Sequence, residues 1–231
     1  MTDATPPFAL HVNHLSYEYS DGYRALEDVT FDVKPGERVG LVGPSGAGKS
    51  TLLMHLNGLL PNPLPTKSSE NGSAMVSVNG LAVSGIHLST IRRDVGFLFQ
   101  DPDDQLFCPT VAEDVAFGPL NLGLPTDEIH RRIVESLDAV GLAGFEKRST
   151  MRLSVGERKR VCLAGLLACR PSVLALDEPS SNLDPRARRR LMTYLAEFPG
   201  SQIIATHDLD FVVEHCQRVL ILDGGRIHAD G

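Results

Sequence analysis

The chain has 231 residues, a length that suits one domain with a sub-domain or two small domains. Hydrophobic residues make up 42% of it and charged residues 22%, which is an ordinary globular balance. The net charge of −7 argues against sequence-independent binding of nucleic acid as the main role. No apolar run approaches the roughly 18 to 20 residues of a membrane span. The first ten residues lack the basic and apolar regions of a secretory signal, so we expect a cytosolic chain.

The first part of the chain is predicted to form strands and then a helix. Residues 8–19 and 29–33 alternate between apolar and polar side chains, and residues 38–43 are a buried run that ends in glycine. Leucines at helical spacing follow between residues 49 and 60. Residues 61–73, rich in Pro, Ser and Asn, are predicted to be an exposed loop. Two strands are expected next, at residues 74–80 and 95–100.

The pattern becomes helical between residues 109 and 140. Thr110 and Glu113 fit a capping box at the start of a helix. An apolar stripe then recurs at helical spacing, at Ile129, Ile133, Leu137 and Val140. We therefore predict a helical sub-domain at residues 101–170, inserted into an α/β core made of residues 1–100 and 171–231.

The last part of the chain alternates strands with helices. Strands are predicted at residues 173–179, 202–206 and 218–227, and helices at residues 185–197 and 209–215. Such alternation predicts a parallel sheet covered by helices.

Residues 43–50, with the sequence GPSGAGKS, match the G-x-x-x-x-G-K-[ST] pattern of a phosphate-binding loop. In such a loop the backbone N–H groups surround phosphates, Lys49 reaches the β and γ phosphates, and the Ser50 hydroxyl binds Mg²⁺. Because a strand precedes the loop and a helix follows it, a chance Gly-rich turn is the weaker interpretation. Tyr19 either stacks on adenine or packs as a core aromatic. The predicted ATP-binding residues are Tyr19, Gly43, Pro44, Ser45, Gly46, Ala47, Gly48, Lys49, Ser50 and Thr51.

Four polar side chains follow strands of the predicted sheet. Asp177 suits a contact to Mg²⁺, and Glu178 points differently and is placed to polarise an attacking water. Gln100 is a candidate contact to Mg²⁺ and water, and a neutral His207 a candidate hydrogen-bond partner of the γ-phosphate. The alternative for each is an ordinary polar side chain at the surface or at a strand end.

A second helix start with features of an anion site lies at residues 153–157, LSVGE. Ser154 and Glu157 fit a capping box. The box does not explain Gly156, which costs helix stability. An anion that approaches the free N–H groups of the helix start closely would explain it.

Taken in this order, these stretches resemble the nucleotide-binding subunit of ABC transporters, over about residues 8–228. The resemblance implies a P-loop NTPase (RecA-like) fold: an α/β parallel-sheet core with an antiparallel β layer and an inserted helical sub-domain. It implies ATP and Mg²⁺ as cofactors. The implied catalytic residues are Glu178, His207, Gln100 and Lys49, and the implied Mg²⁺ contacts are Ser50, Gln100 and Asp177.

The same resemblance implies that two such subunits pair head to tail. The signature of one subunit then covers the ATP of the other, through Leu153, Ser154, Val155, Gly156 and Glu157. The dimer seam would hold Ser181, Asn182, Leu183 and Asp184. Where the family usually has LSGGQ, this chain has Val155 and Glu157 in place of Gly and Gln. The negative charge of Glu157 favours the helix start but weakens contact with an anion.

Residues 97–125 are similar to the ATPase of energy-coupling-factor importers, particularly the cobalt and nickel type. This resemblance implies an ATP-hydrolysing motor for uptake of cobalt or nickel ions or a vitamin. It implies three partners: a second ATPase subunit, identical or different, a transmembrane scaffold subunit and a substrate-binding membrane subunit. The expected location is the cytoplasmic face of the membrane, with the chain attached through these partners.

Three other functions are alternatives to this interpretation. An ABC ATPase of DNA repair or chromosomes would carry a long coiled coil between the phosphate loop and the signature, where this chain has a compact sub-domain. A phosphotransferase would need neither LSVGE nor the SNLD of residues 181–184. An ABC ATPase of another transporter class is a further alternative. No nucleic-acid partner is expected.

Overall fold

The computed structural model describes residues 8–61 and 75–231, which form two compact units. The first unit contains the chain up to Phe97, Ser172–Asp177 and Pro199–Gly231, and the second contains Leu98–Pro171 and Glu178–Phe198. Residues 178–198 thus group with the helical segment by internal packing, and the domain boundaries at residues 100 and 170 stay a prediction. The predicted loop at residues 61–73 lies, except for its first residue, outside the described residues.

The first unit is built around a six-stranded sheet with the order β10-β9-β3-β8-β7-β6. Its centre is β3 (Arg38–Val42), with β8 (Ser201–Ala205) and β9 (Arg218–Asp223) parallel on either side. Strand β7 (Val173–Asp177) pairs parallel with β8. Strands β6 (Val95–Leu98) and β10 (Arg226–Asp230) form the two edges. All residues of β7 and β8 are buried, and their apolar residues, 173–176 in β7 and 203–205 in β8, are therefore consecutive rather than alternating with polar ones.

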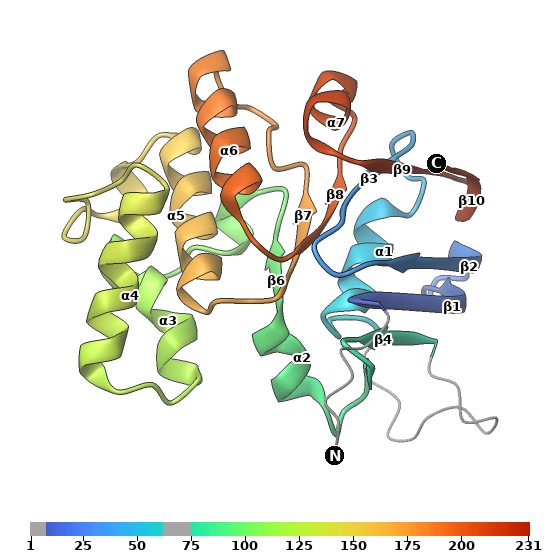
Figure 1. Ribbon diagram of the computed structural model, residues 1–231, viewed down its shortest axis with the longest axis horizontal. Helices are drawn as coiled ribbons and strands as arrows, with labels where there is room; N and C mark the ends of the chain where they lie inside the picture. Colours follow the sequence, from blue (N-terminus) through green and yellow to red (C-terminus); the bar gives the residue numbers. More distant parts are fainter. Residues whose placement is uncertain (1–7, 62–74) are drawn as a thin grey trace. The chain divides into compact units, whose positions relative to one another are not determined.

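A four-stranded sheet with the order β2-β1-β4-β5 forms the second layer of this unit. It consists of β1 (Leu10–Glu18), β2 (Arg24–Val33), β4 (Val76–Val78) and β5 (Leu81–Ala82), all paired antiparallel. Leu10 lies opposite Val33 and Val12 opposite Phe31, so the apolar positions of the two long strands share one buried face. Helix α1 (Lys49–Leu56) contacts strands of both sheets and lies between them (Figure 1).

Two short elements of the first unit differ from the prediction. Helix α2 (Leu88–Asp94) was not expected, because Ile91 is its one fully buried residue and a seven-residue helix shows little apolar periodicity. The predicted strand at residues 218–227 is a hairpin of β9 and β10. Gly224 and Gly225 form its turn with φ of 51° and 76°, a conformation that suits glycine. Helix α7 (Leu209–His215) has the predicted bounds.

The second unit is mainly helical. Helices α3 (Val111–Asn121), α4 (Thr126–Ala139) and α5 (Val155–Ala168) pack against one another (Figure 1), and α6 (Pro185–Glu197) follows later in the chain. Single 3₁₀ turns occur at Pro102–Asp104 and Thr150–Arg152. The predicted capping boxes at Thr110 and Ser154 are both present. Among the described residues, no helix has the length and apolar character needed to cross a bilayer.

Candidate functional site

The predicted phosphate loop joins β3 to α1 in the first unit. Gly48 is the N-cap of α1, and no side chain caps this helix start within the described chain. The N–H groups of the first helical turn therefore lack side-chain acceptors, the arrangement that binds anions. Lys49 Nζ lies 2.8 Å from the Gly43 carbonyl oxygen and 3.0 Å from the Pro44 carbonyl oxygen. The ammonium group thus lies over the loop into which a phosphate would fit.

Two glycines of this loop are required by close backbone packing. A Cβ at Gly43 would lie 1.9 Å from the Leu222 carbonyl oxygen, and one at Gly48 would lie 2.4 Å from that of Ala25. Gly48 also has a φ of 102°, which disfavours other residues. Close approach of a phosphate is therefore not the only reason for these glycines, because the strands that surround the loop exclude any side chain at both positions.

Asp177 and His207 lie at the same edge of the parallel sheet as the phosphate loop. Asp177 pairs with Ala205, and Ala205 pairs with Leu41, so the ends of β7, β8 and β3 are in line. The carboxyl ends of parallel strands form the ligand-binding edge of such sheets. His207 lies two residues after the end of β8 and is exposed there, while Asp177 is only 5% exposed. The first unit thus brings together three of the predicted features.

Oxygen donors at this edge fit a magnesium ion. Ser50 supplies a hydroxyl in the first turn of α1, and Asp177 supplies a carboxylate at the end of β7. Mg²⁺ is usually held by one or two carboxylates together with waters and substrate phosphates. Gln100, the third predicted contact, belongs to the second unit, and its contact with the metal stays a prediction.

Two tyrosines contact the phosphate loop and the helix that follows it. The predicted adenine-binding residue Tyr19 is half-buried, and its hydroxyl lies 3.0 Å from Thr51 Oγ1. Tyr23 was not predicted: its hydroxyl donates to the Gly46 carbonyl oxygen at 3.0 Å, although its side chain is 53% exposed. The sequence signal for Tyr23 is its place after the turn residues Asp21 and Gly22.

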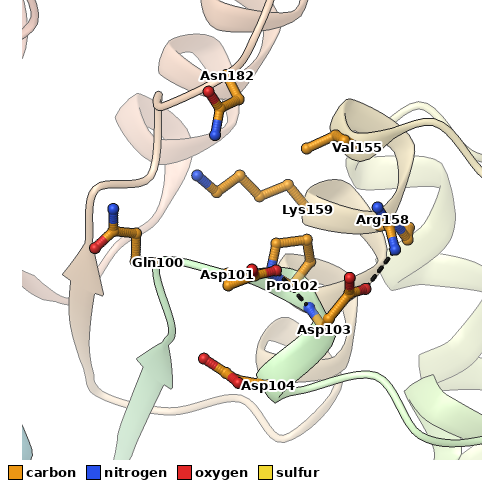
Figure 2. Close-up of a pocket in the computed structure, with 9 residues that line it drawn as sticks. All are labelled: Gln100, Asp101, Pro102, Asp103, Asp104, Val155, Arg158, Lys159 and Asn182. Carbon is orange, nitrogen blue, oxygen red and sulfur yellow. Dashed lines mark hydrogen bonds and ion pairs between the residues drawn. The ribbon is translucent and has the colours of Figure 1, made fainter.

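In the second unit, the segment after Gln100 is attached to α5 and borders a pocket. The Asp103 carboxylate pairs with the Arg158 guanidinium, and Gln105 Nε2 donates to the Cys162 carbonyl oxygen at 3.4 Å. Figure 2 shows the pocket, which measures about 380 Å³. It is lined by Gln100, Asp101, Pro102, Asp103, Asp104, Val155, Arg158, Lys159 and Asn182.

The signature residues form the start of α5. Ser154 is the N-cap, Ser154 and Val155 are exposed, and Leu153 is buried. The Glu157 carboxylate accepts hydrogen bonds from the Ser154 backbone N–H at 2.8 Å and from its hydroxyl at 2.9 Å. The backbone hydrogen bond is the main cause that lowers the Glu157 pKa, so this carboxylate is charged at neutral pH. A negative charge therefore sits where the resemblance places a phosphate.

Residues 181–184 lie against the start of α5. A Cβ at Gly156 would lie 3.3 Å from Leu183 Cδ2, so contact with Leu183 is a second reason for a small residue there, besides an anion. The Asp184 carboxylate accepts from the backbone N–H groups of Ala187 and Arg186 and caps α6. These two hydrogen bonds lower the Asp184 pKa.

The two units divide the predicted site residues between them. The first unit contains Tyr19, residues 43–51, Asp177 and His207. The second contains Gln100, residues 153–157, Glu178 and residues 181–184. The role of each of these residues stays a prediction.

The phosphate loop and the acidic residue at the end of β7 define the class of protein. A phosphate loop between a parallel strand and a helix, with an acidic residue ending a nearby parallel strand, is the arrangement of a P-loop NTPase. The predicted fold class is confirmed, because solved ATP-binding cassettes superpose on the chain. One is the dimeric cassette MJ0796 in a post-hydrolysis state with ADP and Pi, at a TM-score of 0.80 and 27% identity, covering 96% of this chain and 97% of that one.

The chain belongs to the ABC transporter family and is an ATP-binding cassette ATPase. The family profile described as ABC transporter matches residues 26–181. The energy-coupling factor transporter ATP-binding protein EcfA of Methanothermobacter thermautotrophicus is 44% identical over 225 residues, covering 96% of this chain and 70% of that protein. The EcfA of Methanocaldococcus jannaschii is 43% identical, covering 97% and 79%.

Among solved structures, cbiO1 from Clostridium perfringens, part of the ABC transporter complex cbiONQ, superposes with a TM-score of 0.82 at 36% identity. The match covers 97% of this chain and 88% of that one. The predicted family is thus confirmed, as is the predicted ATPase activity. The relatives include the predicted energy-coupling-factor group.

Glu157→Gln is expected to lower the KM for ATP about threefold at low ionic strength, because it removes a negative charge from a helix start that is predicted to meet phosphate. Glutamine keeps the capping box, so the helix start is retained. Steady-state hydrolysis at low and high salt measures the effect, which should shrink as salt rises. Glu197→Gln, at the exposed end of α6, is the matched control. An unchanged or higher KM at low salt would contradict the expectation.

Proposed function

We propose that the chain is the ATP-hydrolysing motor subunit of an energy-coupling-factor importer for cobalt or nickel ions or a vitamin. One observation carries the importer class: relatives named EcfA are 43% and 44% identical over nearly the whole chain. The similarity to cbiO1, part of the ABC transporter complex cbiONQ, supports a transporter subunit, and the preference for cobalt or nickel rests on the resemblance of residues 97–125.

ATP binding is assigned to the edge of the parallel sheet in the first unit. Residues 43–51 would surround the triphosphate with backbone N–H groups, and Lys49 would exchange its two carbonyl contacts for phosphate oxygens. Ser50 and Asp177 would hold Mg²⁺. When bound, the ion neutralises charge on the phosphates. Tyr19 would stack on the adenine.

Hydrolysis is assigned to three further residues. Glu178 would accept a proton from the attacking water as the general base. His207 would donate a hydrogen bond to the γ-phosphate, and Gln100 would respond to the bound nucleotide. These roles rest on the resemblance and on the position of each residue after a strand of the sheet.

Closure of the site is assigned to a second subunit. Ser154 and Gly156 of each subunit would contact the γ-phosphate bound by the other, and residues 181–184 would line the seam. The exposed start of α5 supports this assignment, as does the dimeric form of the similar cassette MJ0796. ATP favours the closed dimer only if it binds that state better than the open one, and a shared pocket supplies this difference.

A membrane partner is assigned to an exposed aromatic surface of the second unit, formed by Phe107, Phe117 and Leu120. Their side chains are 65%, 46% and 59% exposed, and the two phenylalanine rings meet edge to face at 4.7 Å. Exposed apolar clusters of this kind mark interaction sites. A transmembrane scaffold subunit would dock here and carry a substrate-binding membrane subunit, which places the chain at the cytoplasmic face of the membrane.

Purification of the chain from detergent-solubilised membranes tests this assignment. We expect a transmembrane scaffold and a small membrane protein to co-purify, together with a second ATPase if the dimer is mixed. The double variant Phe107→Ser/Phe117→Ser should lose these partners, because it removes apolar contact area. Val213→Ser, which changes a residue of α7 that is 83% exposed, should keep them. Recovery of DNA or ribosomes in place of membrane proteins would contradict the proposal, and uptake of labelled cobalt, nickel and vitamins would distinguish the cargoes.

A further inference from the structure

We propose that Lys159 is a positioning residue for hydrolysis: from helix α5 it holds the backbone of Glu178 in an unfavourable conformation and ties it to the loop of Ser181. This inference rests on the proposed role of Glu178 as general base. Lys159, Glu178 and Ser181 all belong to the second unit, which by itself carries every contact in the argument.

Lys159 is buried in polar surroundings. Its residue is only 4% exposed, and its ammonium nitrogen lies 2.6 Å from the Glu178 carbonyl oxygen. The same nitrogen lies 2.6 Å from Ser181 Oγ and 3.1 Å from the Ser181 carbonyl oxygen. Figure 2 shows its side chain extending from α5 towards the loop that carries Asn182. A buried ammonium group is costly unless such acceptors surround it, so these contacts bind the loop to the helix firmly.

Glu178 has the backbone conformation that these contacts would stabilise. Its φ is 46°, in the left-handed region that residues with a Cβ adopt only at an energetic cost. Its carbonyl oxygen accepts from three donors: Lys159 Nζ, the Ser181 hydroxyl at 2.9 Å and the Ser181 backbone N–H at 3.2 Å. Such a conformation persists only where its surroundings over-determine it, and three donors on one carbonyl do so.

The orientation of this peptide decides where the Glu178 carboxylate points. Asp177 and Glu178 are consecutive in the chain. The left-handed backbone conformation of Glu178 affects the direction of its side chain relative to that of Asp177. A displacement of a reacting group by about 1 Å from its productive position lowers the rate by as much as about 100-fold. Lys159 also lies in α5, whose N-cap is Ser154. A displacement of that helix start would therefore reach Glu178 through the buried ammonium group.

Lys159→Met tests the proposal, because methionine fills a similar space without charge or N–H donors. We expect kcat for ATP to fall about 10- to 30-fold while KM changes less than about threefold, since positioning affects the chemical step and not ATP binding. Lys159→Arg, which keeps charge and donors, should recover most of kcat. Lys147→Met, the same change at an exposed lysine, is the matched control and should match the wild type. The melting temperature of each variant is measured alongside.

A double variant separates this proposal from the role of Glu178 itself. If Lys159 acts through Glu178, then adding Lys159→Met to Glu178→Gln lowers single-turnover hydrolysis no further. A further loss by the full factor overturns the inference, as does wild-type kcat in Lys159→Met. If Lys159→Met and Lys159→Arg lose kcat to the same extent, and lose melting temperature to the same extent, Lys159 has a purely structural role. This result would also overturn the inference. Wild-type turnover in Glu178→Gln would instead remove the general base on which the inference rests.

Ser181→Ala keeps the proposal testable if Lys159→Met does not fold. Alanine removes the hydroxyl that donates to the Glu178 carbonyl oxygen and leaves the lysine in place. We expect a loss of about three- to tenfold in kcat with little change in KM. An unchanged kcat would overturn the inference.

Discussion

Glu178→Gln is expected to bind ATP normally and to lose at least about 100-fold of its turnover, the lower range of what a general base contributes. The amide has nearly the shape of the carboxylate but accepts no proton from water. Because binding is assigned to residues 43–51 and closure to the second subunit, ATP should still close the dimer. The variant should therefore accumulate as an ATP-bound dimer that does not reopen.

Phosphate release measures the turnover of Glu178→Gln, and light scattering with and without ATP measures the dimer. Glu197→Gln makes the same chemical change at an exposed position of α6 and should behave as the wild type in both assays. A Glu178→Gln protein with wild-type turnover would show that another group activates the water.

The elements that the sequence predicted well carry local signals. Helix α6 has the predicted bounds because Asp184 caps it and Pro185 opens it. The apolar stripe of α4 is buried at Ile129 and Ile133, since a periodic helix has one face for the core. Helix α2 was missed because a short helix with a single buried residue has no such pattern. The sequence predicted one strand across the two-glycine turn after β9, because the apolar run of β9 leads directly into the turn.

The site shows the same division between local and distant signals. The phosphate loop was predicted because its glycines, lysine and serine are adjacent in the chain. Tyr23 was missed because its contact with Gly46 joins residues 23 positions apart. Lys159 was missed for the same reason, since its acceptors lie at residues 178 and 181. Contacts that depend on tertiary packing leave no pattern in a single sequence.

Lys49→Ala is expected to weaken ATP binding at least about tenfold, because the ammonium group is the only side-chain cation of the predicted phosphate loop. Equilibrium binding of a fluorescent ATP analogue measures this loss. Lys34→Ala, at an exposed turn between β2 and β3, is the control and should bind as the wild type does.

Ser154→Arg is expected to keep nucleotide binding to the phosphate loop and to block closure, because a large cation at the start of α5 would occupy the place proposed for the partner's phosphate and would oppose the helix dipole.

We expect Lys49→Ala and Ser154→Arg each to be inactive alone. Mixing them should restore activity, because the proposed head-to-tail dimer builds each site from both subunits. A mixed dimer pairs the intact phosphate loop of the Ser154→Arg subunit with the intact signature of the Lys49→Ala subunit, and its other site carries both defects. Random mixing gives half mixed dimers, each with one of two sites, so we expect about a quarter of wild-type turnover if sites act independently. If hydrolysis requires both sites, the same mixture with Glu178→Gln in each subunit should still retain one ATP per mixed dimer. A mixture that neither hydrolyses nor retains ATP above either variant alone would show that each subunit closes its own site.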